Sequence, residues 1–207
     1  MTDAMRTPKQ DRSRLTRQKA LESAVECLAR YGWQGSTMAV VAEHVGISRG
    51  ALQHHFPTRE DLMLAAIEYM FEQRLVKAFP ADAKVPPGQT RESFLIERLL
   101  HYYSDDLFKA ALHVWTAAAS EPAFREKIVP MEARFSREVY RAAMKFLNAD
   151  DSDERSRHLI RSMMDLSRGL GLADLITDDS ARRAKIAKFW AEELSSIKTN
   201  PNDGPDA

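Results

Sequence analysis

The sequence predicts an all-α fold of about nine helices. Its composition favours helix over sheet, because 28 Ala and 19 Leu stand against 9 Val and 8 Ile in 207 residues. Apolar residues recur at helical spacing along most of the chain. No alternating run of β-branched residues followed by a hairpin turn is present.

Four helices are expected in the first 80 residues. The first carries apolar residues at i, i+3, i+4 and i+7 and ends at Gly32, which suits a C-terminal cap; these apolar residues are Leu21, Ala24, Val25 and Leu28. Two short helices follow, one ended by Gly46 and one capped by Ser48 and stopped by Pro57. A fourth begins after Thr58 and fades near residue 79.

The rest of the chain predicts a linker and five more helices. Residues 80–90 are rich in Pro and Gly, which marks a connection. The helices are expected at about 94–103, 107–119, 122–147, 154–175 and in the last apolar stripe, to residue 194. We expect disorder in roughly the first ten residues and in 199–207. The predicted division is therefore 1–59, 60–198 and a disordered tail, 199–207.

Composition limits the cellular locations and the binding partners that can be expected. No apolar run approaches the roughly 18 residues of a membrane-spanning helix, and the N-terminus lacks the apolar region of a secretory signal. Cys27 stands alone, which fits a reducing cytoplasm and excludes an intramolecular disulfide. The formal net charge of zero hides an asymmetry, since residues 1–59 carry nine Lys and Arg against five acids. That basic segment favours a polyanionic partner.

Residues 37–62 contain two short helices that meet at a tight turn around Gly46-Ile47-Ser48 and have the dimensions of a helix-turn-helix. The apolar residues Val41, Val45, Ile47 and Leu52 are expected to hold the pair together. The second helix begins with small residues and can approach base edges in a major groove; its outward residues are Arg49, Gly50, Gln53 and His54. Thr37 and Thr58 lie at helix N-termini, which favour phosphate. A plain helical hairpin with a solvated polar face fits the same geometry.

The segment TMAVVAEHVGISRGALQHHFPTREDL resembles the DNA-binding signature of the TetR family of bacterial transcriptional regulators, and the resemblance spans about residues 14–64. It implies a three-helix DNA-binding domain and a helical C-terminal domain that dimerises and binds a small-molecule inducer. It also implies that Thr37, His54 and Arg59 contact the DNA backbone. Ser48, Arg49 and Gly50 would lie against bases or sugar. His55 would hold the end of the helix within reach of phosphate.

Two positions depart from the family pattern, and a basic stretch precedes it. Gln53 stands where Tyr is most frequent, which leaves both a phosphate contact and adenine readout open. Arg59 replaces the more frequent Lys and keeps its charge. The basic N-terminal residues predict either an arm that contacts phosphate or a solvated helix start; they are Lys9, Arg12, Arg14 and Arg17.

Aromatic residues of the middle helices predict a pocket for a small hydrophobic or aromatic effector, with the alternative that most of them form the core; they are Phe71, Phe94, Tyr102, Tyr103, His113, Trp115, Phe135 and Tyr140. The last two helices carry apolar stripes, which by the resemblance pair in a homodimer; these residues are Leu159, Met163, Leu166, Leu170, Ile186, Phe189, Trp190 and Leu194. A two-fold symmetric dimer fits a palindromic DNA operator.

Enzymatic signatures are missing from the sequence. It contains no phosphate-binding glycine loop, no HExxH and no nucleophile elbow. We therefore expect no catalytic activity, no cofactor and no metal. The expected function is a DNA-binding repressor that its effector releases from the operator. The alternatives are a regulator that responds to no ligand and, from another class, a helical-bundle enzyme.

Overall fold

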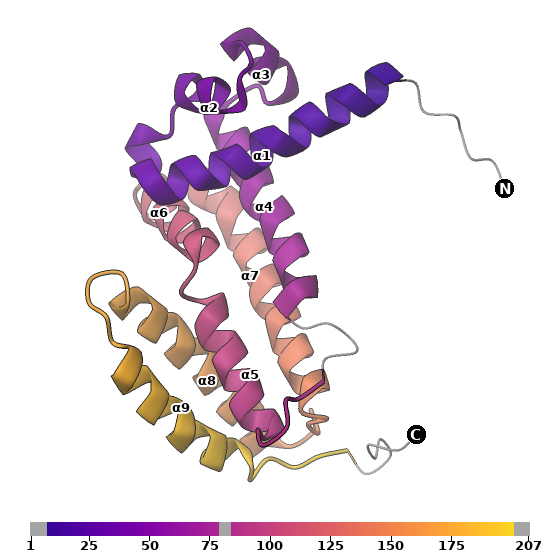
Figure 1. The fold of residues 1–207 in the computed structure, drawn as a ribbon, viewed down its shortest axis with the longest axis vertical. Helices are drawn as coiled ribbons and strands as arrows, with labels where there is room; N and C mark the ends of the chain where they lie inside the picture. Colours follow the sequence, from indigo (N-terminus) through magenta and orange to yellow (C-terminus); the bar gives the residue numbers. More distant parts are fainter. Residues whose placement is uncertain (1–7, 79–83, 201–207) are drawn as a thin grey trace, which may run out of the picture. The chain divides into compact units, whose positions relative to one another are not determined.

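The computed structural model describes residues 8–78 and 84–200, and within them the chain forms nine α-helices (Figure 1). They are α1 (Pro8–Gly35), α2 (Met38–Val45), α3 (Arg49–His55), α4 (Arg59–Ala78), α5 (Arg91–Tyr102), α6 (Asp106–Ser120), α7 (Pro122–Phe146), α8 (Glu154–Ala173) and α9 (Ser180–Leu194). The prediction of an all-α fold of about nine helices is confirmed. None of the described helices combines the length and the apolar character that crossing a membrane requires.

The described residues group into two compact units. The first contains the chain up to Gln73 together with Lys109–Met131, and the second contains Arg74–Phe108 and the chain from Glu132 onward. Helices α4, α6 and α7 therefore contribute residues to both units. The boundary expected at residue 59 remains a prediction, and the structure groups the first part of α4 with α1, α2 and α3.

The first unit is organised by α1, on which α2 packs. The expected apolar stripe of α1 is buried, with Leu21 and Leu28 at most 1% exposed. Gly32 interrupts the helical geometry with φ 67° and ψ −176°. A side chain at Gly32 would also meet the imidazole of His113 on α6 at 3.2 Å. Both the left-handed φ and this close approach favour glycine at the bend.

The second unit is built around α5, α8 and α9, which pack on one another. Asp153 caps α8, because its carboxylate accepts from the Ser156 N–H at 2.8 Å. Seven residues of α8 are buried, among them Gly171, where a side chain would overlap the carbonyl of Tyr103. Helix α8 is therefore fixed along one whole face.

The two ends of the chain differ from the prediction of disorder. Residues 8–10 belong to α1, and proline at the start of a helix is favourable because its missing N–H is not needed there. Thr199 forms an isolated β-bridge with Ala149, and the Asn200 N–H donates to the Asn148 carbonyl at 2.9 Å. These backbone hydrogen bonds order residues 199–200. The remainder of both predicted disordered segments lies outside the described residues.

Candidate nucleic-acid interface

Capping interactions fix the turn between α2 and α3. The Val40 N–H donates to Thr37 Oγ1 (3.3 Å) at the start of α2, and the Ala51 N–H donates to Ser48 Oγ (3.1 Å) at the start of α3. Between the helices, Gly46 adopts φ 78° and ψ 35°. This left-handed conformation favours glycine, and it lets the Gly46 N–H donate to carbonyls in the last turn of α2.

One side of the α2–α3 pair is buried and the other is exposed. Val41 and Leu52 are fully buried, and Phe56 joins them directly after α3. Val45 and Ile47, which were expected with them, are half-buried. Six of the eight residues predicted to contact DNA are exposed, namely Thr37, Ser48, Arg49, Gly50, Gln53 and His54. A few buried side chains thus hold a short helix whose other face is free for a partner.

Gly50 has no role in the packing of the protein. A side chain at this position would meet no atom of the protein within 4 Å. Glycine also costs about 1 kcal/mol relative to alanine inside a helix. A residue that is locally unfavourable and internally unnecessary fits a surface that another molecule approaches closely.

His55 differs from the other predicted contact residues of α3 because it is half-buried. Its ring centre lies 5.9 Å from that of His54 and 6.4 Å from that of Phe56. The side chain thus lies between the exposed face of α3 and the buried residue that follows the helix.

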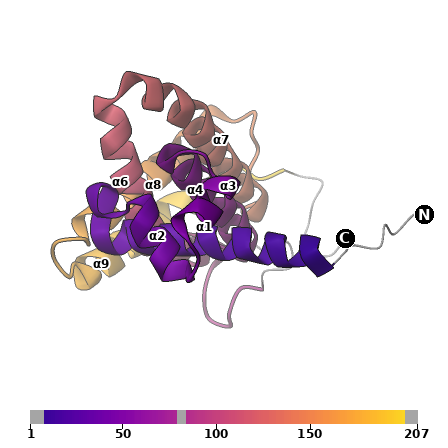
Figure 2. The same ribbon diagram turned by 90° about the horizontal axis from the view of Figure 1, so that it is seen from above.

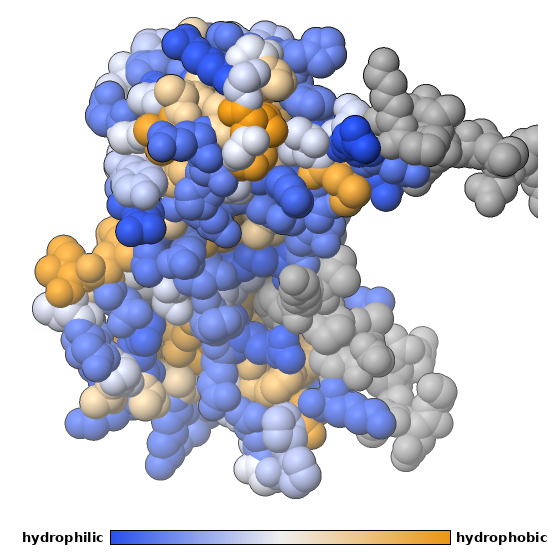
Figure 3. All heavy atoms as spheres, turned by 45° about the horizontal axis from the view of Figure 1, so that its top comes forward, coloured by the Kyte–Doolittle hydropathy of each residue, from blue (hydrophilic) through white to orange (hydrophobic). Residues whose placement is uncertain are grey.

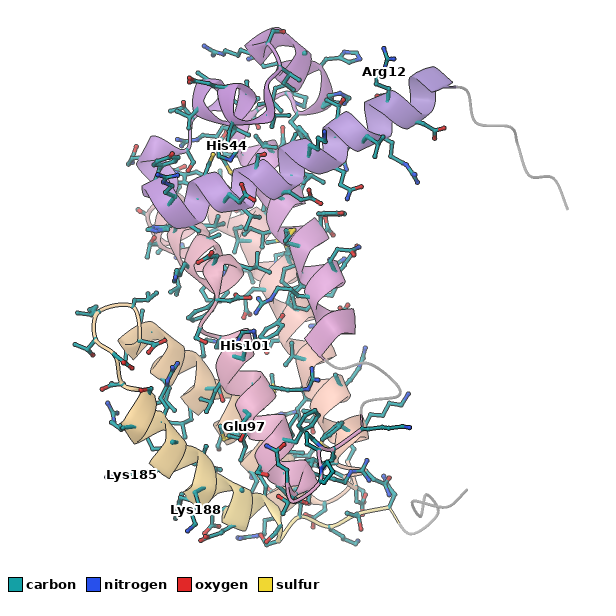
Figure 4. All side chains as sticks on the ribbon, viewed as in Figure 1. Arg12, His44, Glu97, His101, Lys185 and Lys188 are labelled. Carbon is teal, nitrogen blue, oxygen red and sulfur yellow. The ribbon has the colours of Figure 1, made fainter. Side chains whose placement is uncertain are left out.

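The first turns of α1 continue past α2 and α3 (Figures 1 and 2). Their basic side chains Arg12, Arg14, Arg17 and Lys19 are exposed, and Figure 4 labels Arg12 on this part of the helix. The guanidinium carbon of Arg17 lies 5.0 Å from the centre of the Phe56 ring. The basic turns of α1 therefore begin beside the end of α3.

Arg59 is the eighth predicted contact residue, and its surroundings differ from those of the other seven. Its guanidinium carbon lies 4.4 Å from the centre of the Trp33 ring, and its Nη1 donates to the Trp33 carbonyl at 3.4 Å. Its Nε is 3.6 Å from Glu60 Oε1, and the side chain is only 24% exposed. The group that was expected to face phosphate already has partners in the first unit.

A pocket of about 510 Å³ lies within the second unit, lined by Arg74, Phe94, Glu97, Arg98, His101, Tyr102 and Asp105. The Arg74 guanidinium is held in this lining, because its Nη2 lies 2.6 Å from both Asp105 Oδ2 and the Tyr102 carbonyl, to which it donates. Burial lowers the pKa of Arg74, and the nearby Asp105 charge opposes that shift. Burial also raises the pKa of the Tyr102 phenol.

The eight residues predicted for the effector pocket are divided between the units. Phe71, His113 and Trp115 belong to the first unit, and the other five belong to the second. Of those five, Phe94 and Tyr102 line the 510 Å³ pocket, whereas Tyr140 lines a separate pocket of about 390 Å³ between α7 and α8. Tyr103 and Phe135 are buried.

Charged lining residues of the 510 Å³ pocket escaped the sequence prediction, which selected aromatic side chains. Glu97 and His101 are four residues apart on α5, and this spacing was a signal that they share a face. Arg74 and Asp105 come together only through folding, so no local pattern indicated their ion pair.

An open groove of about 710 Å³ follows α5 and α9 in the second unit. Glu97 and His101 of α5 and Lys188 of α9 line it, and Figure 4 labels all three. Alanines and serines make up much of the remaining lining. Because acidic and basic side chains are mixed here, the groove favours no particular ligand charge.

The residues predicted for a dimer interface fall into two groups. Met163, Leu170 and Leu194 are at most 3% exposed within the single chain. These three side chains fill the core of the second unit, and their part in a dimer interface stays a prediction. The other five keep exposed area on α8 and α9, and they are Leu159, Leu166, Ile186, Phe189 and Trp190.

Further apolar surface lies where α8 is connected to α9. Leu172, Leu175 and Ile176 are exposed, Ile176 to 88%. Figure 3 shows apolar surface at the left edge of the molecule. Within the described residues, no three His, Cys, Asp or Glu side chains are grouped as a metal ion would require.

Comparison with known proteins agrees with this geometry. Residues 20–66, which contain α2 and α3, match the model of the bacterial regulatory proteins of the tetR family. The HTH-type transcriptional regulator CymR of Pseudomonas putida is 33% identical over 118 residues, which cover 57% of this chain and 58% of that protein. The HTH-type transcriptional repressor AcnR of Corynebacterium diphtheriae is 31% identical over 117 residues, which cover 55% of each.

The fold is shared over a greater length than the sequence. The multidrug binding protein EbrR, solved with imidazole, has a TM-score of 0.57 at 24% identity, covering 90% of this chain and 97% of that one. The matches to CymR and AcnR, by contrast, span little more than half of those proteins. The family model covers only the helix-turn-helix and its neighbouring residues, whereas the alignments with CymR and AcnR extend beyond it. Residues 20–66 thus match the DNA-binding part of the tetR family, and the chain is similar to HTH-type transcriptional regulators over a little more than half of their length.

Proposed function

We propose that the protein is a sequence-specific DNA-binding transcriptional regulator that represses its target until a small-molecule effector releases it. The observation that carries the proposal is the exposed polar face of α3, capped by Ser48 and supported from below by Leu52. Arg49, Gln53 and His54 supply hydrogen-bonding groups on this face, and Gly50 leaves room for a base edge. Repression is proposed from the likeness to AcnR.

The remaining proposed contacts with DNA are mainly to the phosphate backbone. Thr37 lies at the N-terminus of α2, where backbone N–H groups and the helix dipole attract phosphate. Ser48, at the start of α3, lies against a base or sugar. His55 reaches phosphate from the end of α3. The basic turns of α1 add charge beside that end. Phosphate contacts supply affinity and register, whereas the α3 side chains supply sequence preference.

Selection from a library of randomised duplexes tests this proposal. We expect the wild-type chain to enrich one sequence with two-fold symmetry. Arg49→Ala combined with Gln53→Ala should change the enriched bases, whereas Arg125→Ala, an exposed site on α7 in the same unit, should leave them unchanged. Enrichment of the same sequence by the double variant would contradict base reading by α3.

For the effector we propose the 510 Å³ pocket of the second unit. Its aromatic walls, Phe94 and Tyr102, suit an apolar or aromatic molecule. Its charged lining residues then fix the orientation of that molecule. The choice of this pocket is supported by the half-buried Arg74–Asp105 pair in its lining, because polar groups that are already positioned bind a ligand at little cost in ordering.

A thermal-shift screen of metabolites distinguishes an effector-responsive regulator from one that responds to no ligand. A ligand present at a hundred times its Kd adds about 2.7 kcal/mol of stability and raises Tm. We expect a hit to lower the affinity for the selected duplex, and Tyr102→Ala to abolish the shift. A hit that leaves DNA binding unchanged would favour the ligand-independent alternative.

We also propose that α8 and α9 pair in a homodimer through their exposed apolar residues. Phe189, at 56% exposure, is the largest exposed side chain of this set. Sedimentation should show a dimer for the wild type and a shift toward monomer for Phe189→Glu. Met163→Leu, at a buried site of α8, is the matched control and should leave the dimer intact.

A further inference from the structure

Trp33 and Arg59 flank the segment that contains α2 and α3. Trp33 follows the bend at Gly32, near the end of α1, and Arg59 is the first residue of α4. Both helices of the proposed DNA-binding motif lie between these two positions in the chain. The contact between Trp33 and Arg59 therefore joins the two ends of the segment that contains α2 and α3.

The contact uses both the flat face and a donor of the guanidinium group. Arg59 stacks on the Trp33 ring at 4.4 Å and donates to the Trp33 carbonyl at 3.4 Å. A planar group that stacks and donates at once is specific to arginine, because lysine carries a compact ammonium on a flexible stem. The Trp33 side chain is only 7% exposed, so water does not weaken the stacking as it would at the surface.

Each partner is anchored independently. The Trp33 ring also contacts the Phe124 ring of α7, with centres 5.1 Å apart, and Phe124 is 4% exposed. At the other partner, Thr58 caps α4 by accepting from the Asp61 N–H at 3.1 Å. The backbone before Trp33 is restricted by Gly32, whose carbonyl accepts from the Ser36 hydroxyl at 2.7 Å. The stacked pair thus connects two fixed points.

We propose that Arg59 is a positioning residue that holds the start of α4 against the end of α1 through Trp33, and thereby sets how α3 is presented to DNA. The proposal rests on the proposed DNA-binding function and assigns Arg59 a role other than a phosphate contact. A phosphate contact needs only positive charge and contributes to the salt dependence of binding. Positioning needs the planar group and leaves that dependence unchanged.

The two roles separate in the variants Arg59→Lys and Arg59→Ala. We measure affinity for the selected duplex and for a scrambled duplex over a range of salt concentrations. Positioning predicts that both variants lose about tenfold in affinity for the selected duplex, lose little for the scrambled one, and keep the wild-type salt slope. Arg125→Ala removes one exposed charge from the same unit and should behave as wild type.

Two results would overturn the proposal. If Arg59→Lys binds like wild type while Arg59→Ala loses about one unit of salt slope for each protomer, Arg59 contacts phosphate. If both variants bind like wild type and only Tm falls, the contact supports the fold alone.

Amide hydrogen exchange tests the positioning role without DNA. Arg59→Lys should accelerate exchange in residues 38–55 at least fivefold and leave α8 unchanged, and Arg125→Ala should change neither. Unchanged exchange in residues 38–55 would contradict the proposal. If the wild type enriches no duplex but exchange responds as expected, the DNA-binding function fails and the positioning of α2 and α3 stands.

Discussion

Helices α3 and α8 are held in the protein in opposite ways. Helix α3 has seven residues and buries one of them, Leu52, whereas α8 has twenty residues and buries seven. Each helix contains glycine, but for different reasons. Gly171 of α8 packs against the Tyr103 carbonyl, while a side chain at Gly50 of α3 would meet nothing. Internal packing explains Gly171 of α8, whereas it does not explain Gly50 of α3.

The largest expected effect comes from Gly171→Ala. The added methyl group would overlap the Tyr103 carbonyl, and backbone cannot move aside as a flexible side chain can. We expect a loss of about 3 kcal/mol in unfolding free energy, at the upper end of the usual cost of overpacking, measured by urea denaturation. Gly169→Ala is the matched control on the same helix, because its side chain would meet no atom within 4 Å. Equal stability of the two variants would contradict the packing assigned to Gly171.

The opposite result is expected for Gly50→Ala in α3. Alanine should raise the unfolding free energy by up to about 1 kcal/mol, because it favours the helix and meets no neighbour. Affinity for the selected duplex should fall about tenfold, since the methyl group would occupy space needed for close approach to a base. A more stable variant that binds DNA like wild type would contradict the proposal that Gly50 leaves room for a base edge.

A smaller effect is expected from the basic turns of α1. Arg12→Ala and Arg14→Ala should each weaken binding a few-fold for any duplex and lower the salt slope by about one per protomer. Arg30→Ala provides the control, because Arg30 is exposed near the other end of the same helix. Salt slopes that match the wild type in both variants would assign these residues to a solvated helix start.

The contrast between the helices also explains which features the sequence predicted well. Caps, apolar spacing and proline stops are local signals, so the limits of α2 and α3 follow from Thr37, Gly46, Ser48 and Pro57. The outward face of α3 followed from the same periodicity. Contacts between distant segments left no such signal. Arg59 on Trp33 and Arg74 on Asp105 join residues 26 and 31 positions apart, and each gave a charged side chain a role that composition did not indicate.

The dimer prediction stays open, because an apolar stripe on a helix does not show which surface covers it. Helix α8 carries apolar residues on more than one side. Met163 and Leu170 face the core of the second unit, whereas Leu159 and Leu166 remain partly exposed. Both pairs have the same spacing of seven residues, so only the packing of α5 and α9 distinguishes them.

The smallest expected effect is on stability, at the turn before α8, and it is measured by the dependence of unfolding on pH. Burial and the hydrogen bond donated to Asp151 Oδ1 (2.7 Å) raise the pKa of Tyr140 to about 12, from an ordinary value of about 10. The folded state therefore holds the phenol proton more tightly than the unfolded chain does. The stabilisation is complete below pH 10 and is lost as pH rises toward 12.

Tyr140→Phe removes this hydrogen bond at every pH. Its urea midpoint should lie below that of the wild type at pH 9, and the two midpoints should converge by pH 12, because the wild type has then lost the same interaction. Helix α3 provides the internal comparison, since Ser48 and Leu52, which hold it, do not titrate in this range. Midpoints that stay a constant distance apart from pH 9 to 12 would show that the Tyr140 hydroxyl does not anchor the turn before α8.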